Sequence, residues 1–122
     1  MKELLIIGTT NGKEKEYGIL SLKKEDGAIF DRHCYEGDNA GILCLSHDGK
    51  RVYVANESRD YRGKGSGGGI VSYQIKDDQL IKLNDSLSYG SRPAYLALTK
   101  DDRYLIVANH GSHSSVTIRY EM

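Results

Sequence analysis

Short apolar runs rich in β-branched and aromatic residues, separated by glycine, asparagine and aspartate, follow one another along the chain. This pattern predicts β-strands joined by tight turns and loops. The expected strands are Glu3–Thr9, Tyr17–Lys23, Ala28–Tyr35, Gly41–Ser46, Arg51–Asn56, Gly69–Ile75, Gln79–Leu87, Tyr95–Thr99, Tyr104–Asn109 and Ser115–Tyr120. The fold class expected from the sequence is therefore all-β.

Part of the chain repeats an earlier part almost position for position. Pro93–His110 aligns with Ala40–Glu57, and each copy contains two strand-like runs around a polar turn. The residues that recur unchanged are Leu43, Leu45, Asp48, Val54, Ala55 and Asn56, which return as Leu96, Leu98, Asp101, Val107, Ala108 and Asn109. An internal repeat of about fifty residues indicates a solenoid, an array or a propeller.

Both runs of each copy are apolar almost throughout, as in Leu105-Ile106-Val107-Ala108. A strand without apolar and polar alternation is typically buried on both faces. We therefore expect both strands of each copy to be covered on both faces: Gly41–Ser46, Arg51–Asn56, Tyr95–Thr99 and Tyr104–Asn109.

Further matches extend the repeat to a four-stranded unit. Glu3–Thr9 overlays Arg51–Glu57, and Gly18–Leu22 overlays Gly69–Tyr73. Four-stranded units at this spacing predict a β-propeller, which closes with about 4–8 blades, whereas this chain supplies about two to two and a half. We expect one partial propeller domain over residues 1–122.

The three predicted parts of that domain differ in strand content. Residues 3–38 hold the last three strands of a ring-closing blade, 39–89 one complete blade, and 90–122 the first three strands of the next blade. This suggests the N-terminal part of a longer propeller, although several copies assembling into one ring is an alternative. Open strand edges beside Glu3–Thr9 and Ser115–Tyr120 would then favour self-association.

Charge and cysteine content narrow the functional classes. Seventeen Lys+Arg balance seventeen Asp+Glu, which argues against nucleic acid or an anionic membrane as the main partner. Cys34 and Cys44 lack metal-ligand spacing, so we expect buried or half-buried free thiols and no metal site. The apolar run Leu4–Ile7 is too short for a signal segment, which favours a cytoplasmic location.

A glycine-rich segment, Gly63–Gly69, contains a formal GxGxxG match at Gly63, Gly65 and Gly68. A dinucleotide site would need a strand before these glycines and a helix after them. The residues that follow, Ile70–Ile75, instead read as a strand. We interpret the segment as part of a long loop and expect no nucleotide or other cofactor.

Several motifs resemble the lactonase family of seven-bladed propellers, which includes bacterial 6-phosphogluconolactonases and relatives of carboxymuconate-lactonizing enzymes. They are GTTNG at 8–12, VYVANES at 52–58, GGGIVSYQI at 67–75 and PAYLALTKDDRYLIVANHGS at 93–112. The resemblance implies hydrolysis of a sugar-acid lactone at the mouth of a central channel. It also implies that most catalytic residues lie beyond residue 122, so that the chain alone would be inactive. A non-catalytic binding propeller and a muconate-type lactonizing enzyme are the alternatives.

Five residues are candidates for a channel-facing or substrate-facing role: Glu57, Arg92, Tyr95, Asn109 and His110. A lactone carbonyl needs a general base for water and polar or cationic groups for the oxyanion. Arg92 could bind a substrate phosphate or be an exposed loop residue. Tyr95 stands where the resemblance implies a His, and Tyr is a poorer base at neutral pH.

The remaining polar groups have structural interpretations beside functional ones. Gly8-Thr9, Asn56-Glu57 and Asn109-His110 end equivalent strands, and the asparagines could instead cap turns and join blades through backbone groups. We expect His47 and His113 to be solvated loop residues.

Overall fold

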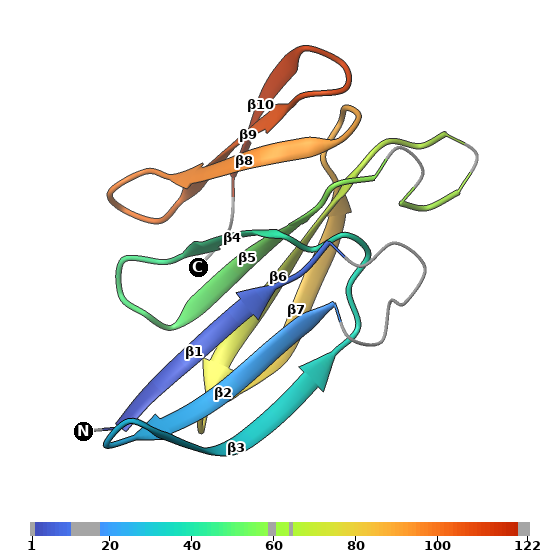
Figure 1. Cartoon of the computed structure of the whole chain (residues 1–122). Helices are drawn as coiled ribbons and strands as arrows, with labels where there is room; N and C mark the ends of the chain where they lie inside the picture. The colour runs from blue at the N-terminus through green and yellow to red at the C-terminus, as the bar shows by residue number, and fades with distance from the viewer. Residues whose placement is uncertain (1, 11–17, 59–60, 64, 120–122) are drawn as a thin grey trace.

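A computed structural model describes residues 2–10, 18–58, 61–63 and 65–119, and within these ranges it contains ten strands in three antiparallel sheets (Figure 1). The first sheet has the order β1-β2-β3, the second β4-β5-β6-β7, and the third β8-β9-β10. The strands are β1 Lys2–Gly8, β2 Ile19–Glu25, β3 Ala28–Tyr35, β4 Ile42–Leu45, β5 Arg51–Asn56, β6 Gly69–Lys76, β7 Gln79–Leu87, β8 Pro93–Leu98, β9 Tyr104–Asn109 and β10 Ser114–Arg119. The expected all-β partial propeller is confirmed.

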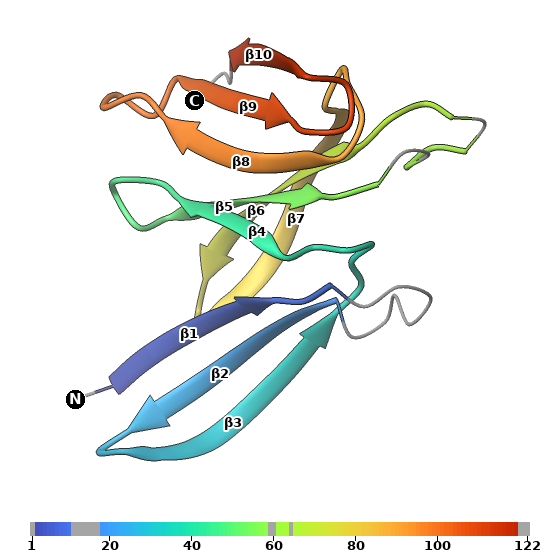
Figure 2. The same cartoon turned by 45° about the horizontal axis from the view of Figure 1, so that its top comes forward.

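The three sheets stack as successive layers, with the four-stranded sheet between the two three-stranded ones (Figure 2). In this view β1, β5 and β9 point toward the same side, as expected for strands at equivalent places in a repeat. None of the described residues forms a helix long and apolar enough to cross a membrane.

Equivalent side chains form the turns of the β4–β5 and β8–β9 hairpins. Ser46 Oγ donates to Asp48 Oδ1 at 2.7 Å, and Thr99 Oγ1 donates to Asp101 Oδ1 at 2.7 Å. Each aspartate also accepts a backbone N–H two residues later, at 2.9 Å for Asp48 and 3.1 Å for Asp101. Aspartate, serine and threonine form such local bonds readily, which explains why the repeat keeps these residues between its strands.

Strand β5 is the centre of the packing because both of its faces are covered. Val52 and Val54 belong to the apolar cluster between the first and second sheets. Tyr53 and Ala55, which point the other way, belong to the cluster between the second and third sheets. Successive side chains of a strand alternate between faces, so one apolar run serves two cores. The expectation for this strand is confirmed.

The same expectation is wrong for β9, for β8, where Tyr95 is 62% exposed, and for β4, where Leu45 is 55% exposed. Leu105 and Val107 are fully buried in the cluster shared with the second sheet, whereas Tyr104 and Ile106 are 37% and 41% exposed. For β8 and β9, the reason is that no described sheet packs on the far side of β8-β9-β10. An apolar run marks a strand that can be covered on both faces, but a neighbouring sheet is needed to cover it.

Candidate functional site

The loops at one end of the stack bring three of the candidate residues together. Glu57 follows β5, His110 follows β9, and Arg92 directly precedes β8. The backbone N–H of Arg92 donates to the Ser58 carbonyl at 2.9 Å, and the N–H of His110 donates to the Arg92 carbonyl at 3.0 Å. Arg92 therefore links the end of the second sheet to the end of the third.

Arg92 and Glu57 form an ion pair between these two sheets. Arg92 Nη2 lies 3.4 Å from Glu57 Oε1, and the two side chains are 41% and 28% exposed. An ion pair this accessible to water adds little stability. It does hold a guanidinium and a carboxylate side by side where a small anion could reach the guanidinium.

Arg92 has a backbone conformation that is unusual for its residue type. Its φ is 55°, in the left-handed region, and the equivalent residue of the previous repeat, Asn39, has φ 48°. Asn39 also accepts the Glu57 N–H at 3.0 Å, just as Arg92 accepts the N–H of His110. Asparagine tolerates this region far better than arginine does. The backbone conformation is therefore no reason for an arginine at this position.

His110 joins the site through its backbone only. Its ring lies in a T-shaped arrangement with His113, with ring centroids 6.2 Å apart. Both rings line an open hollow on the uncovered side of the third sheet with Ala94 and Ala108. Among the described residues, no hydrogen bond or ion pair joins the His110 side chain to Glu57 or Arg92. Its role toward a substrate stays a prediction.

The two asparagines have the structural role that the sequence offered as the alternative. Asn56 Oδ1 accepts the Asp38 N–H at 3.2 Å, and Asn109 Nδ2 donates to the Ser88 carbonyl at 3.0 Å. Both residues are buried, at 2% and 1% exposure, and each holds the connection that enters its blade. A substrate-facing role for Asn109 remains an untested prediction.

Gly8 stands at the equivalent place in the first sheet. A Cβ there would overlap the Ala40 carbonyl oxygen, so the close approach of the β3–β4 connection explains the glycine. Beside it, Thr9 Oγ1 donates to the Gly18 carbonyl at 3.0 Å, which is again a structural contact.

Tyr95 lies on β8 next to an irregularity in the sheet. Pro93 pairs with Asn109 and Tyr95 with Ala108, so Ala94 is an extra residue. The Tyr95 side chain is 62% exposed. Such bulges redirect side chains, and Tyr95 next to this one is exposed. Among the described residues, no hydrogen bond or ion pair joins the Tyr95 side chain to Glu57 or Arg92.

His47 is a solvated turn residue, as expected, but it also makes a contact that the sequence did not predict. Its ring is 56% exposed, but Nδ1 lies 2.6 Å from Asp102 Oδ1, and its backbone N–H donates to both carboxylate oxygens. These bonds from His47 hold the pKa of the Asp102 carboxyl below its ordinary value. The sequence repeat contains a signal for this contact. Asp102 occupies the position that corresponds to Gly49 in the first copy, and both backbones are left-handed, with φ of 60° at Asp102 and 73° at Gly49.

The cysteines are both free, but only Cys44 is half-buried. Cys34 is exposed, which corrects the expectation for that residue, because β3 is an outermost strand with an open face. Burial raises the pKa of the Cys44 thiol. In the ranges described, His, Cys, Asp and Glu form no cluster of three or more that could hold a metal ion. The glycine-rich segment leads into β6, a strand, as expected.

Comparisons with known proteins place this fold. The family model described as a seven-bladed β-propeller lactonase matches residues 3–121. An uncharacterized protein of Staphylococcus epidermidis is 32% identical over 76 residues, which span 61% of this chain and 20% of that protein.

Solved structures agree. A candidate 6-phosphogluconolactonase from Bacteroides uniformis is 26% identical and has a TM-score of 0.81. The match covers 98% of this chain and 34% of the Bacteroides uniformis chain. The periplasmic gluconolactonase of Pseudomonas aeruginosa shares the fold at 24% identity and a TM-score of 0.82. This match covers 99% of this chain and 35% of the Pseudomonas aeruginosa chain. The chain thus spans about a third of the length of these solved relatives.

Proposed function

The chain belongs to the lactonase family of seven-bladed β-propellers, and from this premise we propose that it forms part of an enzyme that hydrolyses a sugar-acid lactone such as 6-phosphogluconolactone. The observation that carries the proposal is the Glu57–Arg92 pair at the ends of adjacent blades. We infer that the strand ends on this side surround the mouth of the complete ring, where the pair would meet a small anionic substrate.

Arg92 binds the anionic substituent of the substrate in this proposal. A guanidinium forms two parallel hydrogen bonds with a phosphate or carboxylate, which gives orientation as well as affinity. Glu57 keeps the guanidinium in place until the substrate arrives. The left-handed backbone of Arg92 supports this role, because a residue retained against its conformational preference contributes through its side chain.

The groups that activate water and hold the oxyanion are expected mostly in blades that this chain does not supply. We therefore expect residues 1–122 alone to lack lactonase activity. The test compares the purified chain with the longest natural product that contains it, using 6-phosphogluconolactone and gluconolactone. Hydrolysis by the longer protein only is the expected result. Rapid turnover by the isolated monomer would overturn this part of the proposal, and no turnover by either would favour a binding propeller without catalysis.

A further proposal concerns the cellular location of the protein. Free thiols at Cys34 and Cys44 favour a reducing compartment, so we expect a cytoplasmic location. The solved Pseudomonas aeruginosa relative is periplasmic, which makes cell fractionation the appropriate check.

Exposed apolar side chains on the outer face of the third sheet favour self-association of the isolated chain. Tyr95 and Ile106 are 62% and 41% exposed on that face. Light scattering after size exclusion would reveal it as a mass above that of the monomer, and a clean monomer would contradict it.

A further inference from the structure

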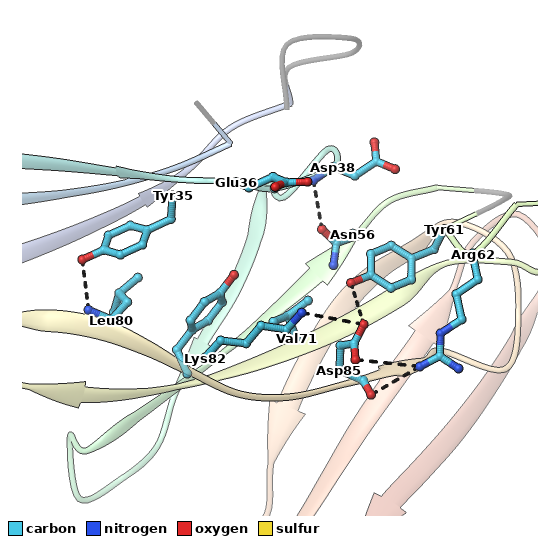
Figure 3. A pocket seen from close by; sticks show the side chains of 12 residues that line it. Tyr35, Glu36, Asp38, Asn56, Tyr61, Arg62, Val71, Leu80, Lys82 and Asp85 are labelled. Atoms are coloured by element: carbon cyan, nitrogen blue, oxygen red, sulfur yellow. Dashed lines mark hydrogen bonds and ion pairs between the residues drawn. The ribbon is translucent and has the colours of Figure 1, made fainter. Parts of the chain in front are cut away.

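A groove of about 500 Å³ lies between the outer strands of the first and second sheets (Figure 3). One wall is formed by Tyr35 and the following Glu36, at the end of β3, and the opposite wall by strands β6 and β7 with the β5–β6 connection. Its size falls within the range of small-molecule sites. Glu57, Arg92 and His110 do not line it. The groove is therefore separate from the lactone site proposed above.

Hydrogen bonds hold the walls of the groove in place. The backbone N–H of Leu80 donates to the Tyr35 hydroxyl at 3.1 Å, which ties β7 to the end of β3. The Tyr61 hydroxyl donates to Asp85 Oδ2 at 3.2 Å, and Figure 3 shows both side chains at one end of the groove. A Cβ on Gly69 would overlap the Tyr61 ring, so this ring packs directly on the backbone of β6.

Tyr73 gives the groove a hydrogen-bond donor that no described residue uses. Its side chain lines the groove, only 7% of the residue is exposed, and its hydroxyl makes no hydrogen bond with any residue that the structure describes. The hydroxyl itself is open to the groove, so water can pair with it in the free chain and a ligand oxygen can replace that water. Burial and then the Glu36 carboxylate raise the pKa of Tyr73, which keeps the hydroxyl protonated and able to donate.

The charges that line the groove nearly balance, which favours a neutral ligand over a charged one. The Asp85 carboxylate has two cationic neighbours, Arg62 Nη2 and Lys82 Nζ, each at 3.9 Å. Glu36 and Asp38 also line the groove, which brings the charged lining to three carboxylates and two cations. Burial and Asp85 raise the pKa of Tyr61 to about 12, so this hydroxyl also stays neutral.

The remaining surface combines hydroxyl groups with apolar side chains. Val71 and Leu80 are buried at its floor, and the rings of Tyr35 and Tyr61 stand beside them. A sugar ring has C–H faces that pack on such groups and hydroxyls that pair with phenols and with the Glu36 carboxylate. We propose that this groove binds a neutral saccharide, with the Tyr73 hydroxyl donating to one of its oxygens.

The test uses the purified chain with ¹⁵N labelling and titrates it with glucose, maltose and cellobiose. At least one sugar should shift the amide signals of Tyr61, Tyr73 and Leu80 and leave those of Arg92 and His110 unmoved. Tyr73→Phe should weaken this binding by about fivefold, the equivalent of one hydrogen bond, with an unchanged or higher melting temperature. The matched control, Tyr95→Phe, changes an exposed tyrosine of the third sheet and should bind as the parent does.

Three results would overturn the proposal. One is that none of the three sugars binds at millimolar concentration, and another is that Tyr73→Phe binds them as well as the parent chain. The third is that gluconate or glucose 6-phosphate shifts the same amide signals at lower concentration than the neutral sugars. Because the groove shares no residue with the Glu57–Arg92 pair, each of these results leaves the lactonase proposal unaffected.

Discussion

His47, in the hairpin turn of the second sheet, is bound by Asp102, in the matching turn of the third. The aspartate accepts the His47 backbone N–H at 3.1 and 3.0 Å and lies 2.6 Å from its ring nitrogen. Asp102 is 5% exposed, so this contact is largely shielded from water on its side. It fastens one blade to the next at the end of the stack opposite the Glu57–Arg92 pair (Figure 1).

Replacing Asp102 should lower the stability of the chain. Asp102→Ala removes the acceptor for a backbone N–H and leaves at φ 60° a residue that tolerates this conformation less well than aspartate, so we expect a melting temperature several degrees below the parent. Asp102→Asn keeps one acceptor and tolerates the backbone, so its loss should be smaller. Thermal unfolding followed by circular dichroism measures both. If both variants kept the melting temperature of the parent, the His47–Asp102 contact would not hold the blades together.

The contribution of Asp102 should depend on pH in acid. Its pKa in the folded chain is below the ordinary value of 3.8, chiefly because of the His47 ring and then its backbone N–H. A lowered carboxyl pKa stabilises the folded state above the unfolded value, and this stabilisation is lost as the pH falls through the folded value. The gap in melting temperature between parent and Asp102→Asn should therefore narrow as the pH falls below the ordinary carboxyl pKa of 3.8. A gap that widened there would contradict this assignment.

Glycine should suit the backbone at position 92 better than any other residue. Arg92→Gly relieves the left-handed conformation, whereas Arg92→Ala keeps it, so the glycine variant should be more stable than the alanine variant by about 1 kcal/mol. Both variants lose the exposed ion pair equally. Urea unfolding measures the difference. Asn39→Gly serves as the control and should change stability only slightly, since asparagine already tolerates this conformation. An alanine variant as stable as the glycine variant would refute the strain at Arg92.

Neighbouring residues of β9 should respond very differently to truncation. Leu105 is fully buried, so Leu105→Ala should cost about 2–5 kcal/mol in unfolding free energy. Ile106 is 41% exposed on the uncovered face, and Ile106→Ala should cost less than about 1 kcal/mol. Denaturant unfolding of both variants in the isolated chain measures this. Similar losses would mean that the outer face of the third sheet is covered in solution.

The strands and their order could be predicted because the repeat marks equivalent positions and because β-rich runs alternate with turn residues. The exposure of Ile106 could not be predicted, since it depends on whether another sheet covers β9. The same limit explains Cys34, which lies on an outermost strand. Local pattern describes what a strand can bury, and the neighbouring layers decide what it does bury.

The candidate site was predicted residue by residue but not as a set of contacts. Arg92 and Glu57 were both candidates, yet their pairing joins residues far apart in the chain and leaves no periodic signal. The Tyr35–Leu80 bond and the groove beside it were missed for the same reason. Asp102 in the place of Gly49 was a visible exception to the repeat, and such exceptions are the positions to inspect first.

The specificity of Arg92 for an anionic substituent tests the functional account most directly. The measurement is kcat/KM of the longest natural product containing this chain, for 6-phosphogluconolactone and for gluconolactone, in the parent and in Arg92→Gly. We expect the variant to lose about tenfold or more for the phosphorylated lactone, as for a lost charge-assisted hydrogen bond, and less than about twofold for the other. Equal losses for both lactones, or none for either, would contradict the role assigned to Arg92.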